Sequence, residues 1–206
     1  MTIFQQQKIK VVEEMNQHQE LFSHIRKFKD LNISDESVLT AKIKYRKVKR
    51  KEFLLQEHQV CNAYYFVLRG CLRLYRNTDS GTEQVLQFAI GSWWISDFQS
   101  FEAKAPSEYN IQAVQDTEVL ILTRFDYEEL FTMVPVLESY FRLMMQKAYT
   151  ASLKKIELLL CESAEERYIQ FVNTFPGFVQ TIPQYMLASF LGFTPQFLSM
   201  LRARKE

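Results

Sequence analysis

The stretch Gln184–Ala203 constrains this chain most, because it contains two short helix patterns separated by a tight turn. In its first half, Leu187 and Leu191 lie four residues apart on one helical face, next to the small Ala188. Gly192 follows, where the end of a helix favours a residue that tolerates a left-handed backbone.

The second half of this stretch begins with a capping signal. Thr194 can cap a helix with its hydroxyl, and Pro195 suits the first helical position, where no amide hydrogen is needed. Phe197, Leu198 and Leu201 then lie on one apolar face. Apolar spacing alone would also fit a plain helical hairpin. The small alanine, the glycine and the Thr-Pro cap at matching offsets favour a helix-turn-helix that reads DNA.

Composition places the chain among ordinary globular proteins. It has 206 residues, of which 47% are hydrophobic and 24% charged, and no apolar run is long enough to span a membrane. It lacks the pattern of a signal peptide, and its three cysteines have no CxxC spacing, so we expect a reduced, cytoplasmic protein. The net charge is only +1, so DNA affinity must come from locally placed charges.

The middle of the chain has the pattern of an antiparallel sandwich or barrel. From about residue 32, short segments with period-two alternation are separated by turn signals, as at 63–68, 71–76 and 82–90 with turns at 69–70 and 77–81. Residues 109–114 and 118–122 read as a hairpin across 115–117. Before the barrel, residues 1–30 predict one or two helices, with Ile9, Val12, Met15 and Phe22 at loosely helical spacing.

Residues 42–51 carry seven basic side chains in ten positions. We interpret them as a solvated edge strand, because lysines protect sheet edges from pairing. A second surface for nucleic acid remains the alternative.

A long helix is predicted from about 136 to 160, after a capping pattern at Asp126 and Glu129 and an interruption at Pro135. Two apolar rows follow it. One contains Leu137, Phe141, Met144, Ala148 and Ala151, and the other contains Met145, Tyr149, Ser152, Ile156 and Leu159. Two neighbouring rows predict a second buried surface, so we expect a homodimer through residues 136–160. A merely amphipathic helix is the alternative.

A further capping box, Ser163 to Glu166, starts a helix that runs to about Thr174, and a short connection through Pro183 leads to the helix-turn-helix. This order of elements resembles the cyclic-AMP receptor and fumarate-nitrate regulator (Crp/Fnr) family of bacterial transcription factors. The segments that carry the resemblance are Lys51–Leu55, Tyr64–Tyr75 and Ser163–Tyr168. With Trp93-Trp94 and the early end of the chain, they look most like the branch common in Bacteroidetes-type bacteria.

The resemblance implies an α+β fold with a jelly-roll barrel like a cyclic-nucleotide-binding domain. The expected domains are an N-terminal sensor over 1–131, a dimerisation helix over 132–160 and a DNA-binding domain over 161–206, without a C-terminal wing. The implied partners are a two-fold DNA operator, a second copy of the chain and a small effector; RNA polymerase is a further candidate. We expect no enzymatic activity, no cofactor and no membrane association.

This chain departs from the family at the nucleotide site. Ser96-Asp97 looks like the Gly-Glu pair that holds the ribose, but Ser107 stands ten residues after Asp97, where an arginine would pair with the cyclic phosphate. Glu108 follows it. Loss of that guanidinium costs on the order of 2–5 kcal/mol, so we expect weak or absent cyclic-AMP binding. The candidate effector pocket comprises Trp93, Trp94, Ser96, Asp97, Ser107, Glu108, Tyr109 and Ser152, and its aromatic residues could equally be barrel core.

The DNA contacts are expected from the second helix of the motif. Gln196 suits adenine and Met200 suits a thymine methyl group. Thr194 and Ser199 are candidates for base or phosphate contact, and the basic residues are candidate phosphate clamps: Arg202, Arg204 and Lys205. No guanine-reading arginine is present at the start of this helix.

Other sensors and enzymes lack the residues they need. Cys61, Cys71 and Cys161 are too few for a four-cysteine Fe–S cluster. A cupin-like metalloenzyme would need clustered histidines, and His18, His24 and His58 form no His-x-His pair. His58 as a haem ligand, or an adaptor that contacts only proteins, remain alternatives.

Overall fold

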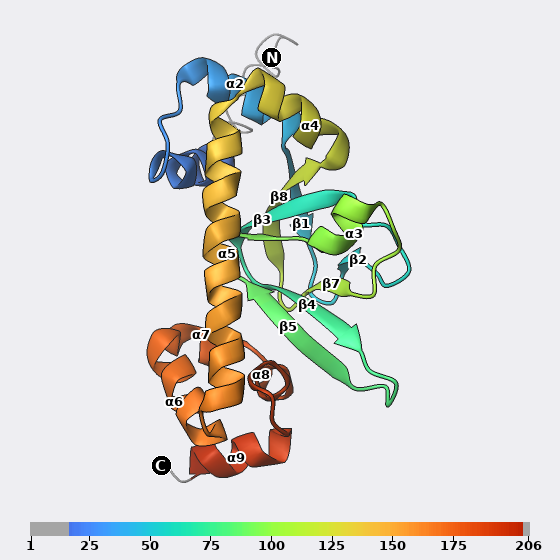
Figure 1. Ribbon diagram of the computed structural model, residues 1–206, viewed down its shortest axis with the longest axis vertical. Helices are drawn as coiled ribbons and strands as arrows, with labels where there is room; N and C mark the ends of the chain where they lie inside the picture. The colour runs from blue at the N-terminus through green and yellow to red at the C-terminus, as the bar shows by residue number, and fades with distance from the viewer. Residues whose placement is uncertain (1–16, 204–206) are drawn as a thin grey trace, which may run out of the picture. The chain divides into compact units, whose positions relative to one another are not determined.

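A computed structural model describes residues 17–203 of the chain (Figure 1). The predicted helix residues Ile9, Val12 and Met15 lie outside this range, as do the candidate phosphate clamps Arg204 and Lys205. Contacts between Cα atoms divide the chain into two compact units. We call residues 17–74 and 88–143 the barrel unit, and residues 75–87 and 144–203 the helix-turn-helix unit. Two strands and the longest helix each contribute residues to both units.

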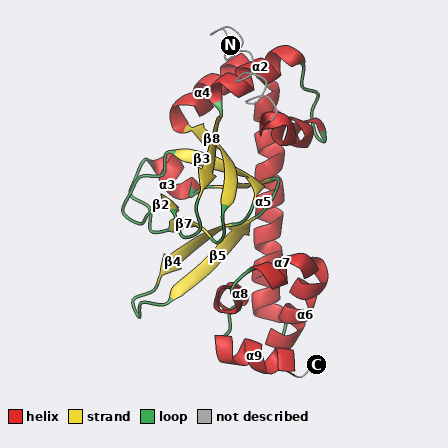
Figure 2. Cartoon of the chain, turned by 180° about the vertical axis from the view of Figure 1, so that it is seen from behind, coloured by secondary structure: helices red, strands yellow, loops and turns green. Residues whose placement is uncertain are grey.

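The strands form two four-stranded sheets, drawn in yellow in Figure 2. One sheet has the order β1-β8-β3-β6 and the other β2-β7-β4-β5. The strands are β1 (Lys44–Val48), β2 (Phe53–Leu55), β3 (Ala63–Arg69), β4 (Leu72–Asn77), β5 (Glu83–Ala89), β6 (Trp93–Ile95), β7 (Asn110–Ala113) and β8 (Thr117–Thr123). Pairing is antiparallel at β1–β8, β3–β8, β3–β6 and β2–β7, as a jelly-roll barrel requires.

The predicted hairpin at 109–122 is wrong. The two segments form strands, β7 and β8, but they belong to different sheets: β7 pairs with β2, and β8 with β1 and β3. The turn at Gln115 and Asp116 carries the chain from one sheet to the other. Each of the two strands it joins pairs with strands that are distant in the sequence. Short strands joined by a tight turn thus need not pair with one another.

The strand texture expected from residue 32 begins later, because α2 (Ile33–Lys42) is a helix. Asn32 caps it, accepting from the Asp35 amide while the Asp35 carboxylate accepts from the Asn32 amide. The basic stretch that follows contains β1, an edge strand whose Lys44, Arg46 and Lys47 are exposed, so the edge-strand prediction is confirmed.

Helices around the barrel sheets are residues 17–26, α2, α3 (Phe98–Ala103), α4 (Arg124–Met133) and the first part of α5 (Val136–Cys161). The capping signal of α4 lies earlier than expected, because Thr123 is its cap and accepts from the Asp126 amide. The predicted long helix is confirmed. Its first part is buried in the barrel unit, where Leu137 and Tyr140 are 0% exposed.

The helix-turn-helix unit contains the rest of α5 together with α6 (Ala164–Thr174), α7 (Pro176–Thr181), α8 (Gln184–Leu191) and α9 (Pro195–Ala203). The capping box at Ser163 and Glu166 is confirmed at the start of α6. The connection expected after Thr174 instead contains α7, which begins at Pro176. Proline suits a first helical position, so the residue that predicted an ending also starts the next helix.

Candidate nucleic-acid interface and effector pocket

The turn between α8 and α9 has the geometry that its residues predict. Gly192 is left-handed, with φ of +78°, and a Cβ there would lie 3.0 Å from Leu159 Cδ2. The Phe193 amide donates to the Ala188 carbonyl at 3.0 Å, which closes α8. Thr194 Oγ1 then accepts from the Phe197 amide at 3.2 Å and caps α9.

Apolar residues on both helices form the core of the motif. Ala188 and Leu198 are fully buried, and Leu187 and Leu201 are nearly so. Because these residues hold the inner faces together, the opposite face of α9 is left for contacts outside the chain. The predicted helix-turn-helix is therefore present as a packed unit.

The structure places four of the candidate DNA residues on or next to the exposed face of α9: Thr194, Gln196, Ser199 and Met200. Two of their polar groups are already engaged within the helix, since Thr194 caps it and Ser199 Oγ donates to the Pro195 carbonyl at 3.0 Å. The Gln196 amide and the Met200 thioether thus remain as the groups best able to reach base edges. Arg202 lies in the last turn and is half-buried.

Arg167 holds the motif onto the end of α5. Its Nε donates to the Leu191 carbonyl at 3.1 Å and its Nη1 to the Glu162 carbonyl at 2.8 Å. A cation near the last carbonyls of two helices also interacts favourably with their dipoles. The sequence marked this arginine only as part of a recurring segment. Its role needs the fold, because Leu191 lies 24 residues further along the chain.

In the barrel unit, the candidate effector residues Asp97 and Ser107 do meet. Asp97 is 4% exposed and caps α3: its Oδ1 accepts from the amides of Gln99 and Ser100 at 3.1 and 3.2 Å. Ser107 Oγ donates to Asp97 Oδ2 at 2.6 Å and accepts from the Tyr109 amide at 2.9 Å. The amides at the start of α3 therefore already donate to this carboxylate and are not available to an incoming anion.

The other candidate pocket residues do not converge on this pair. Ser96 is buried and donates to the Ala63 carbonyl at 2.9 Å, whereas Glu108 is exposed and Trp93 is 41% exposed. Ser152 belongs to the helix-turn-helix unit, is exposed, and donates to the Ala148 carbonyl of its own helix. The eight candidates are thus not one assembled pocket within the barrel unit.

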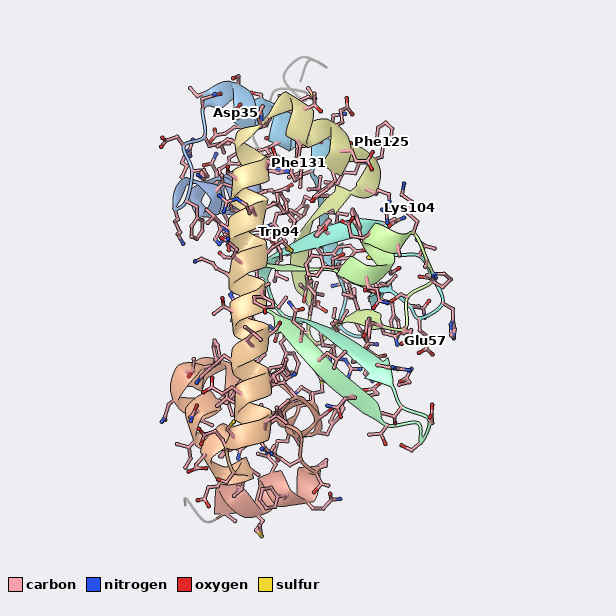
Figure 3. All side chains as sticks on the ribbon, viewed as in Figure 1. Asp35, Glu57, Trp94, Lys104, Phe125 and Phe131 are labelled. Carbon is pink, nitrogen blue, oxygen red and sulfur yellow. The ribbon has the colours of Figure 1, made fainter. Side chains whose placement is uncertain are left out.

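Trp94 is part of an aromatic cluster in the barrel unit and is labelled beside α5 in Figure 3. Its Nε1 donates to the Tyr140 hydroxyl at 2.9 Å, and its ring packs against Phe141 with centroids 5.2 Å apart. Phe101, 2% exposed, packs on Tyr64 at 4.4 Å. Phe98, Tyr127 and Phe131 extend the same cluster. Tyr64, Phe101, Tyr140 and Phe141 are buried like core residues, whereas Trp94, Phe98, Tyr127 and Phe131 are partly exposed at the edge of the cluster.

An open depression of about 650 Å³ lies elsewhere in the barrel unit. It is lined by Asn62, Lys104, Thr123, Arg124, Phe125, Glu128 and Glu129, of which Lys104 and Phe125 are labelled in Figure 3. None of these residues is among the candidate effector contacts. Its charged lining groups have both signs, so it does not select a ligand class.

The second part of α5 carries a stripe of exposed apolar side chains. Tyr149, Leu153, Ile156 and Leu160 are 67%, 47%, 51% and 80% exposed. Their spacing of four, three and four residues puts them on one narrow face. The apolar row traced from the sequence contained Tyr149 and Ile156 but passed through Ser152, so it missed Leu153 and Leu160. A strict heptad count would have found both.

Neither a metal-binding group nor a membrane-spanning helix is found among the residues that the structure describes. Residues 17–203 contain no group of three or more His, Cys, Asp and Glu side chains placed to hold a metal ion. His58 lies in an exposed turn with φ of +70°, and His18 is buried, with Nε2 2.8 Å from the Ile43 carbonyl oxygen. Within the same range, none of the helices is both long and apolar enough to cross a membrane.

Comparison with known proteins agrees with this architecture. Residues 45–133 match the family model of the cyclic nucleotide-binding domain. The chain is 26% identical over 147 residues to the transcriptional activator protein Anr of Pseudomonas protegens, an alignment that covers 69% of this chain and 58% of Anr. Less than two thirds of Anr is therefore matched.

Solved structures share the fold at lower identity. FixK2 from Bradyrhizobium japonicum superposes with a TM-score of 0.67 at 18% identity, covering 79% of this chain and 83% of FixK2. CLP from Xanthomonas campestris, a c-di-GMP responsive global regulator, gives 0.68 at 13% identity, with 84% and 91% covered. The catabolite activator protein of Thermus thermophilus gives 0.54 at 20% identity, with 86% and 84% covered. The chain is thus similar to a cyclic nucleotide-binding domain over residues 45–133 and shares its fold with these solved structures.

Proposed function

We propose that this protein is a homodimeric transcriptional regulator that reads a two-fold DNA operator through α8 and α9. The observation that carries the proposal is the packed helix-turn-helix whose outer face on α9 exposes Gln196 and Met200. A helix presented in this way fits the major groove, where the amide of Gln196 pairs with adenine and Met200 contacts a thymine methyl group.

The DNA-binding region has few basic side chains that could contact phosphate groups. Residues 161–206 contain four basic and four acidic side chains, and Arg167 is committed to carbonyl groups of its own unit. Arg202, Arg204 and Lys205 are then the candidates for phosphate contacts. We infer that the salt dependence of binding is shallow for this fold and that each half-site binds weakly alone.

Weak half-sites make the second copy important. The exposed stripe at Tyr149, Leu153, Ile156 and Leu160 fits a helix pair in which each protomer covers the other's apolar face. A two-fold dimer would place its readers on half-sites about 34 Å apart along the duplex.

The effector of such a regulator is not cyclic AMP. Asp97 already fills the amide groups at the start of α3, and Ser107 donates to its carboxylate rather than presenting a guanidinium to a phosphate. An anionic ligand at this site would meet the buried Asp97 carboxylate and, at position 107, a serine hydroxyl instead of a guanidinium. We propose that any effector of the barrel is uncharged or apolar.

The experiment that tests the reader is selection from random duplex DNA, followed by competition binding with two variants. We expect Gln196→Ala to relax the preference at one base pair, worth about 1–3 kcal/mol of discrimination. Arg202→Ala should weaken all sequences equally and lower the salt slope by about 2, since the dimer carries two copies. No enrichment of any sequence by the native protein would contradict the proposal.

Calorimetric titration with cyclic AMP tests the effector. No saturable heat is expected at submillimolar nucleotide. Saturable binding would mean that backbone amides or another cation hold the phosphate and that Asp97 moves away from α3.

An adaptor that contacts only proteins is the second candidate, favoured by the balanced charge of residues 161–206. Retention on heparin separates the two. A DNA reader elutes at a salt concentration that depends on Arg202, whereas an adaptor shows no such dependence.

A further inference from the structure

A single serine joins the edge of β5 to the first helix of the motif. Ser189 on α8 accepts from the Val85 amide at 2.9 Å through its Oγ, and the same hydroxyl donates to the Glu83 carbonyl at 2.8 Å. The Gln84 side chain also donates to the backbone carbonyl of Ser189. All four residues belong to the helix-turn-helix unit, and both ribbon views draw β5 beside α8 (Figures 1 and 2).

These contacts give hydrogen-bond partners to backbone groups at the edge of the sheet. β5 is the last strand of its sheet, so its outer amide and carbonyl groups have no neighbouring strand. A serine hydroxyl has one donor and two acceptor positions, and Ser189 uses both functions on alternate residues of the edge. Val85 is fully buried, so its amide would have no water to replace this bond.

The same strand is tied to α5 by a lysine. Lys155 Nζ donates to the Leu86 carbonyl at 2.8 Å and lies 3.8 Å from the centroid of the Phe190 ring, which follows Ser189 on α8. The hairpin segment 75–87 thus bonds both to the helix that carries the exposed stripe and to the helix that begins the motif. It forms a strut between them, in addition to the tie made by Arg167.

We propose that Ser189 is a positioning residue that fixes the reader relative to α5, so that the dimer accepts only one half-site spacing. The inference rests on the proposed function of a dimeric DNA reader. The strut leaves Gln196 and Met200 exposed, so it is compatible with DNA in contact with α9. One inserted base pair moves a half-site by about 3.4 Å and turns it by roughly a tenth of a helical turn, which a fixed reader cannot follow.

The test measures binding to the operator selected by the native protein and to versions with one base pair inserted or removed at the centre. The native dimer should lose about 100-fold in affinity on each altered spacing. Ser189→Ala should bind the original spacing within about five-fold of the native protein but lose only about 10-fold or less on the altered ones. Ser189→Thr keeps the hydroxyl and should restore the discrimination.

Thr174→Ala is the matched control, because the Thr174 hydroxyl lies in the same unit and donates to the Gln170 carbonyl of its own helix. It should leave the spacing preference unchanged. Equal spacing preference in the native protein and Ser189→Ala would overturn the inference, as would a native dimer that tolerates all three spacings.

A second measurement separates this inference from the proposed function. Hydrogen exchange of the Val85 amide should be slow in the native full-length protein and clearly faster in Ser189→Ala, whether or not DNA binds. If selection yields no operator, the proposed function fails, while exchange still reports on the strut. Unchanged exchange at Val85 in Ser189→Ala would show that the bond does not hold the strand, and the inference fails alone.

Discussion

The two parts of α5 use apolar residues in opposite ways. In the first part, Leu137, Tyr140 and Phe141 are at most 5% exposed and pack within the barrel unit. In the second part, the stripe residues Leu153 and Leu160 are 47% and 80% exposed. One continuous helix therefore buries its apolar side chains within its own chain at one end and leaves them exposed at the other.

Under the proposed dimer, the difference separates apolar residues that serve folding from those assigned to assembly. Aromatic rings around Phe141 pair with it at centroid distances of 5.2 to 6.0 Å, so its burial is complete without a second protein. The stripe instead follows the spacing of a coiled-coil seam, whose holes are supplied by another helix. Substitutions in the first part should therefore change stability, and substitutions in the second part should change association.

The largest expected effect comes from placing charges in the stripe. Leu153→Asp combined with Ile156→Asp would bury four carboxylates in a two-fold interface, at a cost of more than about 5 kcal/mol of association free energy. Sedimentation should find a monomer, and the affinity for the selected operator should fall by at least about 100-fold.

Lys154→Asp is the matched control for this pair. Lys154 lies on the same helix away from the stripe, where its exposed ammonium bonds Glu157 at 3.0 Å. It should remain a dimer. A double stripe variant that stayed dimeric would show that the stripe is not the interface and would remove the contrast between the two parts of α5.

The next largest effect is expected from Phe141→Ala in the buried part. Removing a ring from this aromatic cluster leaves a cavity and should lower the free energy of unfolding by about 3–5 kcal/mol. The association constant of the folded variant should not change. Urea denaturation and sedimentation together check this, and a variant that loses association while keeping its stability would reverse the assignment.

Local signals explain what the sequence predicted well. The left-handed Gly192, the Thr194 cap and the buried Ala188 each act within a few residues of their partners, so the helix-turn-helix could be placed to within a residue or two. The capping box at Ser163 was predictable for the same reason.

Features that depend on distant partners were not predictable. The strands β7 and β8 looked like a hairpin because nothing local shows that each has its partner in another sheet. The sequence drew attention to Ser107, ten residues after Asp97. It did not show that Asp97 caps α3, which makes its carboxylate unavailable to a ligand. The bond from the Val85 amide to Ser189 joins residues 104 apart, so no local pattern could reveal it.

A smaller effect is expected from the pH dependence of stability, through Lys155 in the second part of α5. Burial lowers the pKa of Lys155 from 10.5 to about 8, although the Leu86 carbonyl and the Phe190 ring favour its charged form. Between these two values the unfolded chain binds more protons than the folded one, so stability should rise with pH from about 8 to 10.5. The gain is roughly 1–3 kcal/mol.

Other groups titrate in this range, so the measurement is the difference between the native protein and Lys155→Met in urea denaturation at several pH values. Met keeps the length of the side chain without its charge. The variant should show a flatter rise than the native protein, and two parallel profiles would contradict the assignment to Lys155.

The smallest effect is expected from Ser152→Ala, which sharpens the edge of the stripe. The Ser152 hydroxyl is exposed and donates to the Ala148 carbonyl of its own helix at 2.9 Å. Alanine has the better helix propensity, so stability should change by less than about 0.5 kcal/mol. If the interface ends at the stripe, the dimer dissociation constant should change by less than about two-fold.

Ile156→Ala, one turn further on, is the matched comparison and should weaken the dimer by about 10-fold or more, because it removes a stripe side chain. An equally large loss in Ser152→Ala, measured by sedimentation at several concentrations, would mean that the interface follows the row through Ser152 instead of the heptad through Leu153. The buried and open parts of α5 would then differ in the width of the apolar face as well as in what covers it.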